Sequence, residues 1–217
     1  MQEQPNGLAA EIGYGRIRSD IILGVLGPSE RLRLEAMKVH YGVGTNTLRE
    51  VLSRLSSEGL VVAEAQRGFE VAPVSIQNLR ELAQLRILLE HHAMEQSFRG
   101  GDVEWEGRVV AAHHKLAATE RAIAASGDDP ASRRRYDSEF HQALISNCGS
   151  GELIKAHLAV FDKYFRYTLQ YAGRSTVEQH KALLECALAR DVAGAKAVLV
   201  EHIEECVAHA AATGELR

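Results

Sequence analysis

Apolar residues follow two different patterns along the chain, and the change comes near Pro73. Before this point, short apolar segments alternate with glycine, serine and threonine. After it, apolar residues recur at helical spacing almost to the C-terminus. The pattern therefore predicts a flexible N-terminal tail over 1–12, a small first domain over 13–74 and an all-helical second domain over 75–217.

The first domain is predicted to contain helices over about 14–26, 34–40 and 45–58, and strands over 60–63 and 69–72. Thr45 or Asn46 can cap the third helix, and Gly59 ends it. A short turn between the second and third helices, followed by two strands, is the order of elements in a winged helix-turn-helix domain. A small α+β domain of another kind could show the same order.

Six helices are predicted in the second domain, over about 75–99, 103–126, 131–147, 151–171, 176–190 and 192–212. The breaks between them carry turn-forming residues such as Gly100-Gly101 and Pro130. Loops this short place consecutive helices side by side in opposite directions. The predicted fold class is therefore mainly α, with a winged helix-turn-helix domain followed by an antiparallel helical bundle.

Composition and charge narrow the class of protein. Apolar residues make up 46% and charged residues 25% of the chain, which is typical of a folded globular protein and excludes extensive disorder. No apolar run approaches the roughly 18 residues of a membrane span, and the start of the chain lacks a signal-peptide pattern. We therefore expect a cytoplasmic protein without membrane contact. Three cysteines without CxxC spacing predict reduced thiols, and a net charge of −4 argues against unspecific binding of polyanions.

The sequence GVGTNTLREVLSRLSSEGLV, residues 42–62, resembles the recognition helix and following strand of the GntR family of bacterial transcription regulators. The likeness covers roughly 15–73 and includes the Arg67-Gly68 pair in the expected wing. It implies a winged helix that binds double-stranded DNA. The chain departs from the family at Gly44-Thr45, where many members carry Ser-Arg.

Candidates for DNA contact are Thr45, Asn46, Thr47, Arg49, Arg67 and Gly68. Arg49 lies one turn into the recognition helix, from which a guanidinium can bond a guanine edge in the major groove. The residues at the helix start can meet phosphates and base edges with side-chain and backbone donors. Residues 1–74 carry eight basic and nine acidic side chains. This balance predicts modest affinity per domain and therefore a homodimer on a palindromic operator.

Four residues of the second domain have the types and positions expected of a metal site: Asp137, His141, His180 and His202. Asp137 and His141 are one helical turn apart and share a face. His180 and His202 fall on the apolar sides of the last two helices, so both are expected to point inward. Carboxylate and imidazole ligands suit a divalent ion, with zinc expected first and nickel, iron or manganese as alternatives. Taken singly, an inward histidine is more often a hydrogen-bonded core residue.

The same four residues resemble the metal ligands of the FCD effector domain in the FadR subfamily of GntR regulators. This second likeness covers residues 75 to about 209, with Gln179 where an acidic residue is commoner. It implies that the four residues bind the metal and that the effector is a small organic acid. Arg86 is the candidate to bind the effector's carboxylate, and a surface ion pair with Glu90 one turn later is an equal alternative.

These features predict a dimeric, effector-responsive transcription repressor. In one alternative, the same regulator holds a purely structural metal. In another, the metal activates water in a hydrolase. The nearest acid in sequence, Glu139, lies off the face that carries Asp137 and His141, and a hydrolase would leave the DNA-binding half unexplained. We therefore expect a regulator rather than an enzyme.

Overall fold

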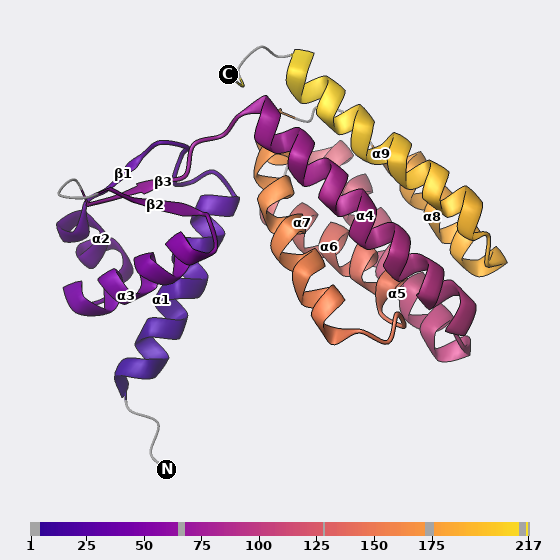
Figure 1. The fold of residues 1–217 in the computed structure, drawn as a ribbon, viewed down its shortest axis with the longest axis horizontal. Coiled ribbons are helices and arrows are strands. Elements are labelled where there is room, and N and C mark those ends of the chain that lie inside the picture. Colours follow the sequence, from indigo (N-terminus) through magenta and orange to yellow (C-terminus); the bar gives the residue numbers. More distant parts are fainter. Residues whose placement is uncertain (1–4, 65–67, 128, 172–175, 213–215, 217) are drawn as a thin grey trace. The chain divides into compact units, whose positions relative to one another are not determined.

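A computed structural model of the chain describes residues 5–64, 68–127, 129–171, 176–212 and 216. The chain divides into two compact units, Met1–Val74 and Ser75–Arg217 (Figure 1). Within the described residues, no helix combines the length and the apolar character that crossing a membrane requires.

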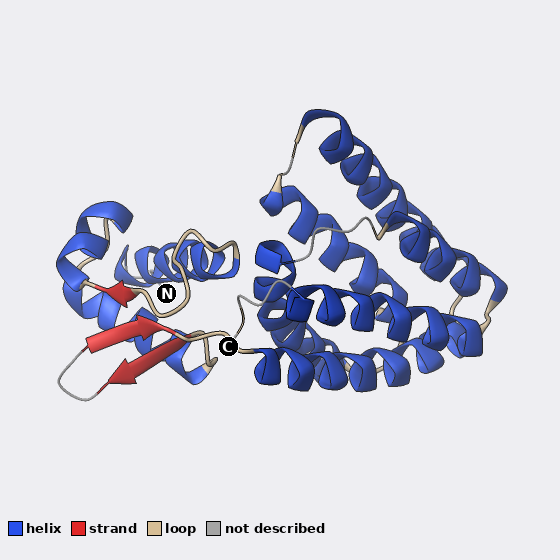
Figure 2. Cartoon of the chain, turned by 90° about the horizontal axis from the view of Figure 1, so that it is seen from above, coloured by secondary structure: helices blue, strands red, loops and turns tan. Residues whose placement is uncertain are grey.

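The N-terminal unit combines helices with a small antiparallel sheet. Its elements are α1 (Pro5–Ile22), β1 (Arg31–Leu32), α2 (Leu34–Tyr41), α3 (Thr45–Ser57), β2 (Val61–Glu64) and β3 (Gly68–Val71). β3 lies between β1 and β2 and is antiparallel to both (Figure 2). The pairing of Val61 with Val71 and of Glu64 with Gly68 sets the register of the hairpin. The predicted winged helix-turn-helix fold is confirmed.

The apolar face of α3 forms the centre of this unit's core. Its residues Leu48, Leu52 and Leu55 are fully buried, and α3 packs against α1, α2 and β2. The close approach of α1 to the turn before α3 depends on Gly13, because a Cβ at this position would lie 2.9 Å from Cγ2 of Val43. A bulkier residue at position 13 would push the two segments apart.

Three details of the N-terminal unit differ from the prediction. α1 begins at Pro5, inside the segment that we expected to be a tail, and it ends at Ile22 rather than near residue 26. The edge strand β1 has two residues, too few to give a periodic signal. Gly44 occupies the N-cap of α3, and no side chain caps this helix, so the expected capping by Thr45 or Asn46 was wrong.

Helices joined by loops and turns make up the described part of the C-terminal unit, which contains no strand (Figure 2). Its helices are α4 (Ile76–Gly100), α5 (Val103–Ser126), α6 (Pro130–Ile145), α7 (Gly151–Tyr171), α8 (Val177–Ala189) and α9 (Val192–Ala212). α4 packs against α6, α7 and α9, and α5 packs against α6 and α8. The side chains of Ser75, Asp102 and Asp129 cap α4, α5 and α6 by accepting from backbone N–H groups of the first turn. The predicted helical bundle is confirmed.

The first turn of α4 is held by a side chain of α7. The buried hydroxyl of Tyr167 donates to Oδ1 of Asn78 at 2.9 Å and accepts from the backbone N–H of Ser75 at 3.3 Å. Ser75 is the first residue of the C-terminal unit. This contact therefore fixes the start of the unit against α7.

We predict opposite effects on stability for two glycine-to-alanine changes in the N-terminal unit. Gly42 adopts a φ of +66° at the C-terminus of α2, so Gly42→Ala should lower the free energy of unfolding by about 1–2 kcal/mol. Gly15 lies in α1 with open space around it, so Gly15→Ala should raise that free energy by about 0.5–1 kcal/mol. Urea unfolding followed by circular dichroism measures both. Equal changes in the two variants would contradict the left-handed turn at Gly42.

Candidate metal centre

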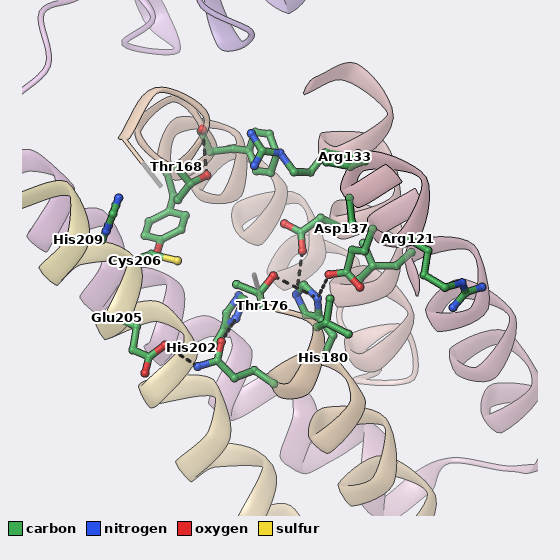
Figure 3. A pocket seen from close by; sticks show the side chains of 18 of the residues that line it. Arg121, Arg133, Asp137, Thr168, Thr176, His180, His202, Glu205, Cys206 and His209 are labelled. Carbon is green, nitrogen blue, oxygen red and sulfur yellow. Dashed lines mark hydrogen bonds and ion pairs between the residues drawn. The ribbon is translucent and has the colours of Figure 1, made fainter. Parts of the chain in front are cut away.

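The four predicted metal ligands come together inside the C-terminal unit. Asp137 and His141 lie on α6, His180 on α8 and His202 on α9. One ring nitrogen from each histidine lies within 4.8 Å of the others, and all three rings are buried. Oδ1 of Asp137 lies 3.1 Å from Nε2 of His180 and 3.7 Å from Nε2 of His141. Figure 3 shows Asp137, His180 and His202 pointing into the same space.

Each histidine of the cluster has a different acceptor for its other ring nitrogen. Nδ1 of His141 contacts Oε2 of Glu90 at 2.7 Å, and Nδ1 of His180 contacts Oε1 of Glu120 at 2.8 Å. Nδ1 of His202 contacts the side-chain oxygen Oε1 of Gln179 at 3.2 Å. Because an oxygen acceptor requires a proton on Nδ1, these contacts assign the proton to Nδ1 in the neutral rings. Nε2 is then the nitrogen available as a ligand.

Two buried polar atoms at the centre of the cluster indicate whether a cation fits there. Oδ1 of Asp137 and Nε2 of His180 are buried, and neither atom completes a hydrogen bond although they are 3.1 Å apart. Unsatisfied buried polar atoms are costly, and a cation that accepts both lone pairs removes the cost. Three imidazole nitrogens and one carboxylate are a common donor set for divalent transition metals. The residues present therefore fit a divalent metal.

Burial and neighbouring charges shift the pKa values of the cluster residues in different directions. Burial by itself raises the pKa of Asp137, but the contact with His180 and the nearby positive charges outweigh it and hold this pKa well below its usual range. Burial lowers the pKa of His180, yet Asp137 and Glu120 reverse that effect and raise the pKa to about 9. Burial and the charges of His180 and Arg86 hold the pKa of His202 well below its usual range. Asp137 is therefore a carboxylate and His202 a neutral imidazole, the forms in which they can bind a metal, whereas His180 must lose a proton to bind one.

Arg86, the predicted effector residue, is buried beside the cluster. Its Nε donates to Oε1 of Glu90 at 2.5 Å, and both side chains are inaccessible to solvent. The guanidinium also lies over the rings of Phe161 and Tyr164, with Cζ 4.7 Å and 4.9 Å from their centroids. The ion pair with Glu90 therefore exists, but it lies in the core rather than at the surface, where we expected it as the alternative. A role for Arg86 in effector binding remains a prediction.

The contact between Arg86 and His141 leaves the ligand nitrogen of this ring accessible. Nη2 of Arg86 is 3.0 Å from Nε2 and 3.2 Å from Nδ1 of His141. If Nη2 lay in the plane of the ring at these two distances, it would overlap the ring carbons. Nη2 must therefore lie over the face of the ring. A cation over the ring opposes protonation of the imidazole. The in-plane lone pair of Nε2 stays available.

A cavity of about 490 Å³ opens beside the cluster. Asp137, His180 and His202 line it (Figure 3), and Arg86 is among its other lining residues. Apolar side chains form much of the remaining wall, namely Leu116, Ile123, Ala124, Phe165 and Val177. A volume of this size is typical of a pocket for a small molecule.

The predicted DNA-contact residues do not all face solvent. Asn46 and Arg49 of α3 are exposed and Thr45 is partly exposed. Thr47 is only 6% exposed, so its side chain packs largely in the core, and its contact with DNA stays a prediction. Gly68 begins β3 with a φ of +90°. Arg67 lies outside the described residues.

The sequence analysis did not predict the contacts with the buried histidines or with one another that four residues around the cluster make: Glu90, Glu120, Gln179 and His157. His157 is fully buried, and its Nε2 lies 3.0 Å from Oε1 of Glu90. Glu90 follows Arg86 by one turn, and this spacing was a usable signal. Glu120 and Gln179 meet their histidines through packing between helices, for which the sequence offers no local pattern.

Comparisons with known proteins identify both units. Residues 81–205 match the FCD domain, and residues 9–71 match the family described as bacterial regulatory proteins, gntR family. The HTH-type transcriptional regulator BphR of Paraburkholderia xenovorans is 37% identical over 216 residues, which cover 95% of this chain and 87% of that protein. The HTH-type transcriptional repressor GlaR of Escherichia coli is 33% identical over 201 residues, which cover 88% of this chain and 90% of that protein.

Solved structures agree on the fold. E. coli McbR/YncC superposes with a TM-score of 0.79 at 18% identity, covering 95% of this chain and 99% of that one. A transcriptional regulator GntR from Rhodococcus superposes with a TM-score of 0.76 at 22% identity, covering 96% of this chain and 99% of that one. The matched families and relatives are transcription regulators rather than enzymes. The chain belongs to the GntR family of DNA-binding bacterial transcription regulators and carries a C-terminal FCD domain.

Proposed function

We propose that this protein is a repressor that binds a palindromic operator as a homodimer and responds to a small organic acid at a metal site. The observation that carries the proposal is the cluster of Asp137, His141, His180 and His202 beside a cavity that also contains Arg86. The likeness to GlaR, which is named a repressor, supports the sign of regulation. Because one winged helix contacts few base pairs, two are needed for a specific site.

The metal is held by three imidazoles and the carboxylate of Asp137. Zinc suits this donor set best, with nickel, iron and manganese as alternatives. Such an ion supplies a Lewis acid to which an anionic ligand can bind. Glu90, Glu120 and Gln179 keep the three rings oriented through their Nδ1 atoms.

The effector is a small carboxylate that enters the cavity with its acidic group toward the metal and Arg86. The guanidinium of Arg86 supplies a fixed positive charge at this end, and the apolar wall accepts the body of the molecule. A purely structural metal is the second candidate. The position of the cluster beside the cavity favours a metal that coordinates the effector.

We predict that carboxylates stabilise the protein only when the metal site is intact. At a concentration of 100 times its dissociation constant, a ligand adds about 2.7 kcal/mol of stability, which raises the unfolding temperature of a chain of this size by several degrees. His202→Ala removes one ligand and should lower both the metal content and this response. Elemental analysis and thermal unfolding with a panel of aliphatic and aromatic carboxylates measure the effect.

His114→Ala is the matched control for this experiment, because His114 is an exposed histidine outside the cluster. It should retain the metal and the carboxylate response. Wild-type protein that contains no metal after purification without chelator, and takes up none on addition, would overturn the metal assignment. A full carboxylate response in metal-free His202→Ala would make the metal structural.

We predict that Arg49→Ala weakens binding to the specific operator by about 1–3 kcal/mol and relaxes discrimination at one base position. Arg49 is exposed on α3, and a guanidinium there can bond a guanine edge. Arg54→Ala is the control, because Arg54 is ion-paired with Glu11 and lies over the ring of Tyr14. Fluorescence anisotropy with an operator selected from random duplexes measures both variants. Equal losses for Arg49→Ala on specific and random duplexes would make Arg49 a phosphate contact instead.

A further inference from the structure

The acceptors behind the three ligand histidines are not equivalent. Two of them, Glu90 and Glu120, are carboxylates with N···O distances of 2.7 Å and 2.8 Å to their rings. The third, Gln179, is a neutral amide, and its oxygen lies 3.2 Å from Nδ1 of His202. Among the three proposed ligand histidines, His202 therefore has the weakest hydrogen bond from its Nδ1.

A second contact determines which way the Gln179 amide points. Its Nε2 donates to Oε2 of Glu205 at 2.9 Å. Because a carboxylate can only accept, the nitrogen must face Glu205 and the oxygen must face His202. The three side chains thus form a chain from Glu205 through Gln179 to His202. Glu205 and Gln179 also line the cavity (Figure 3 labels Glu205 and His202).

The acceptor behind a histidine affects how strongly the ring holds a metal. A hydrogen bond from the distal N–H fixes the ring and its tautomer and raises the basicity of the ligating nitrogen. A carboxylate does this more strongly than an amide, because it carries a full negative charge.

We propose that Gln179 is a positioning residue for His202 and that its neutral amide sets the metal affinity of the site below the level that a carboxylate in its place would give. The inference rests on the metal site proposed above. Gln179 is then the position at which a substitution can change the metal affinity of the site, since Glu90 also forms the buried ion pair with Arg86. A metal at this site therefore exchanges more readily than a metal whose three histidine ligands all donate to carboxylates.

The chain offers an exchange that tests this role at constant net charge. In the double variant Gln179→Glu/Glu205→Gln, the amide introduced at position 205 can donate to the carboxylate introduced at position 179. The hydrogen bond between α8 and α9 is kept, while a carboxylate now faces His202. The single change Gln179→Glu is a poorer test, because it would bring two carboxylates together.

The measurement is the Zn²⁺ affinity of the full-length protein, by competition with a chromophoric chelator at fixed pH. The exchange should raise the affinity at least tenfold, and Gln179→Leu should lower it by about 10- to 100-fold. Glu139→Gln should stay near wild type. Glu139 is a suitable control because it pairs with Lys115 and contacts none of the histidines. Visible absorption of the Co²⁺-loaded proteins should differ between wild type and Gln179→Leu, because the orientation of His202 changes.

Unchanged or lower Zn²⁺ affinity in the exchange variant, with metal-free thermal unfolding like that of wild type, would overturn the role of Gln179. An affinity of Gln179→Leu equal to wild type, with an identical Co²⁺ spectrum, would do the same. These results differ from failure of the proposed function, in which wild-type protein binds neither Zn²⁺ nor Co²⁺.

Discussion

The buried carboxylate of Glu90 is the interaction on which the C-terminal unit depends. It accepts from Arg86 on α4, from His141 on α6 and from His157 on α7, so one side chain joins three helices. Burial by itself raises the pKa of Glu90, but the charge of Arg86 and the two histidines outweigh it and hold the pKa well below its usual range. A charged group in this position is tolerated only with all its partners present, because an isolated charge in the core is strongly destabilising.

This arrangement gives Arg86 two tasks. It neutralises Glu90 in the core, and it carries positive charge along one wall of the cavity. The two tasks are compatible because Nε takes part in the ion pair while Nη2 lies over the face of His141. Burial and the charge of Arg86 together lower the pKa of His141, a proposed metal ligand, against the opposite effect of Glu90.

Local sequence patterns predicted most of the elements, though not β1 or the bounds of α1, because turn residues separate the helices. They also placed Asp137 and His141 on one helical face, and the resemblance to the FCD domain added support for His180 and His202. Features that depend on packing between distant segments were not predictable. Gly13 interrupts the apolar pattern of α1, yet it permits the approach of Val43 rather than ending the helix. Thr47 is a residue type that often contacts DNA, but it lies on the face of α3 that packs against the core and is therefore buried. The partners of His157 and His180 come from helices far away in sequence.

The hydroxyl of Tyr167 connects two regions that have been described separately. Its helix, α7, contributes Tyr164, Phe165 and Thr168 to the cavity wall. The same helix holds the first turn of α4 through Ser75 and Asn78, directly after the residue that ends the N-terminal unit. A shift of α7 would therefore act on the first turn of α4, which directly follows the N-terminal unit. In the regulator proposed above, a signal from the cavity would need no direct contact between the two units, because one helix, α7, contacts both the cavity and the start of the C-terminal unit.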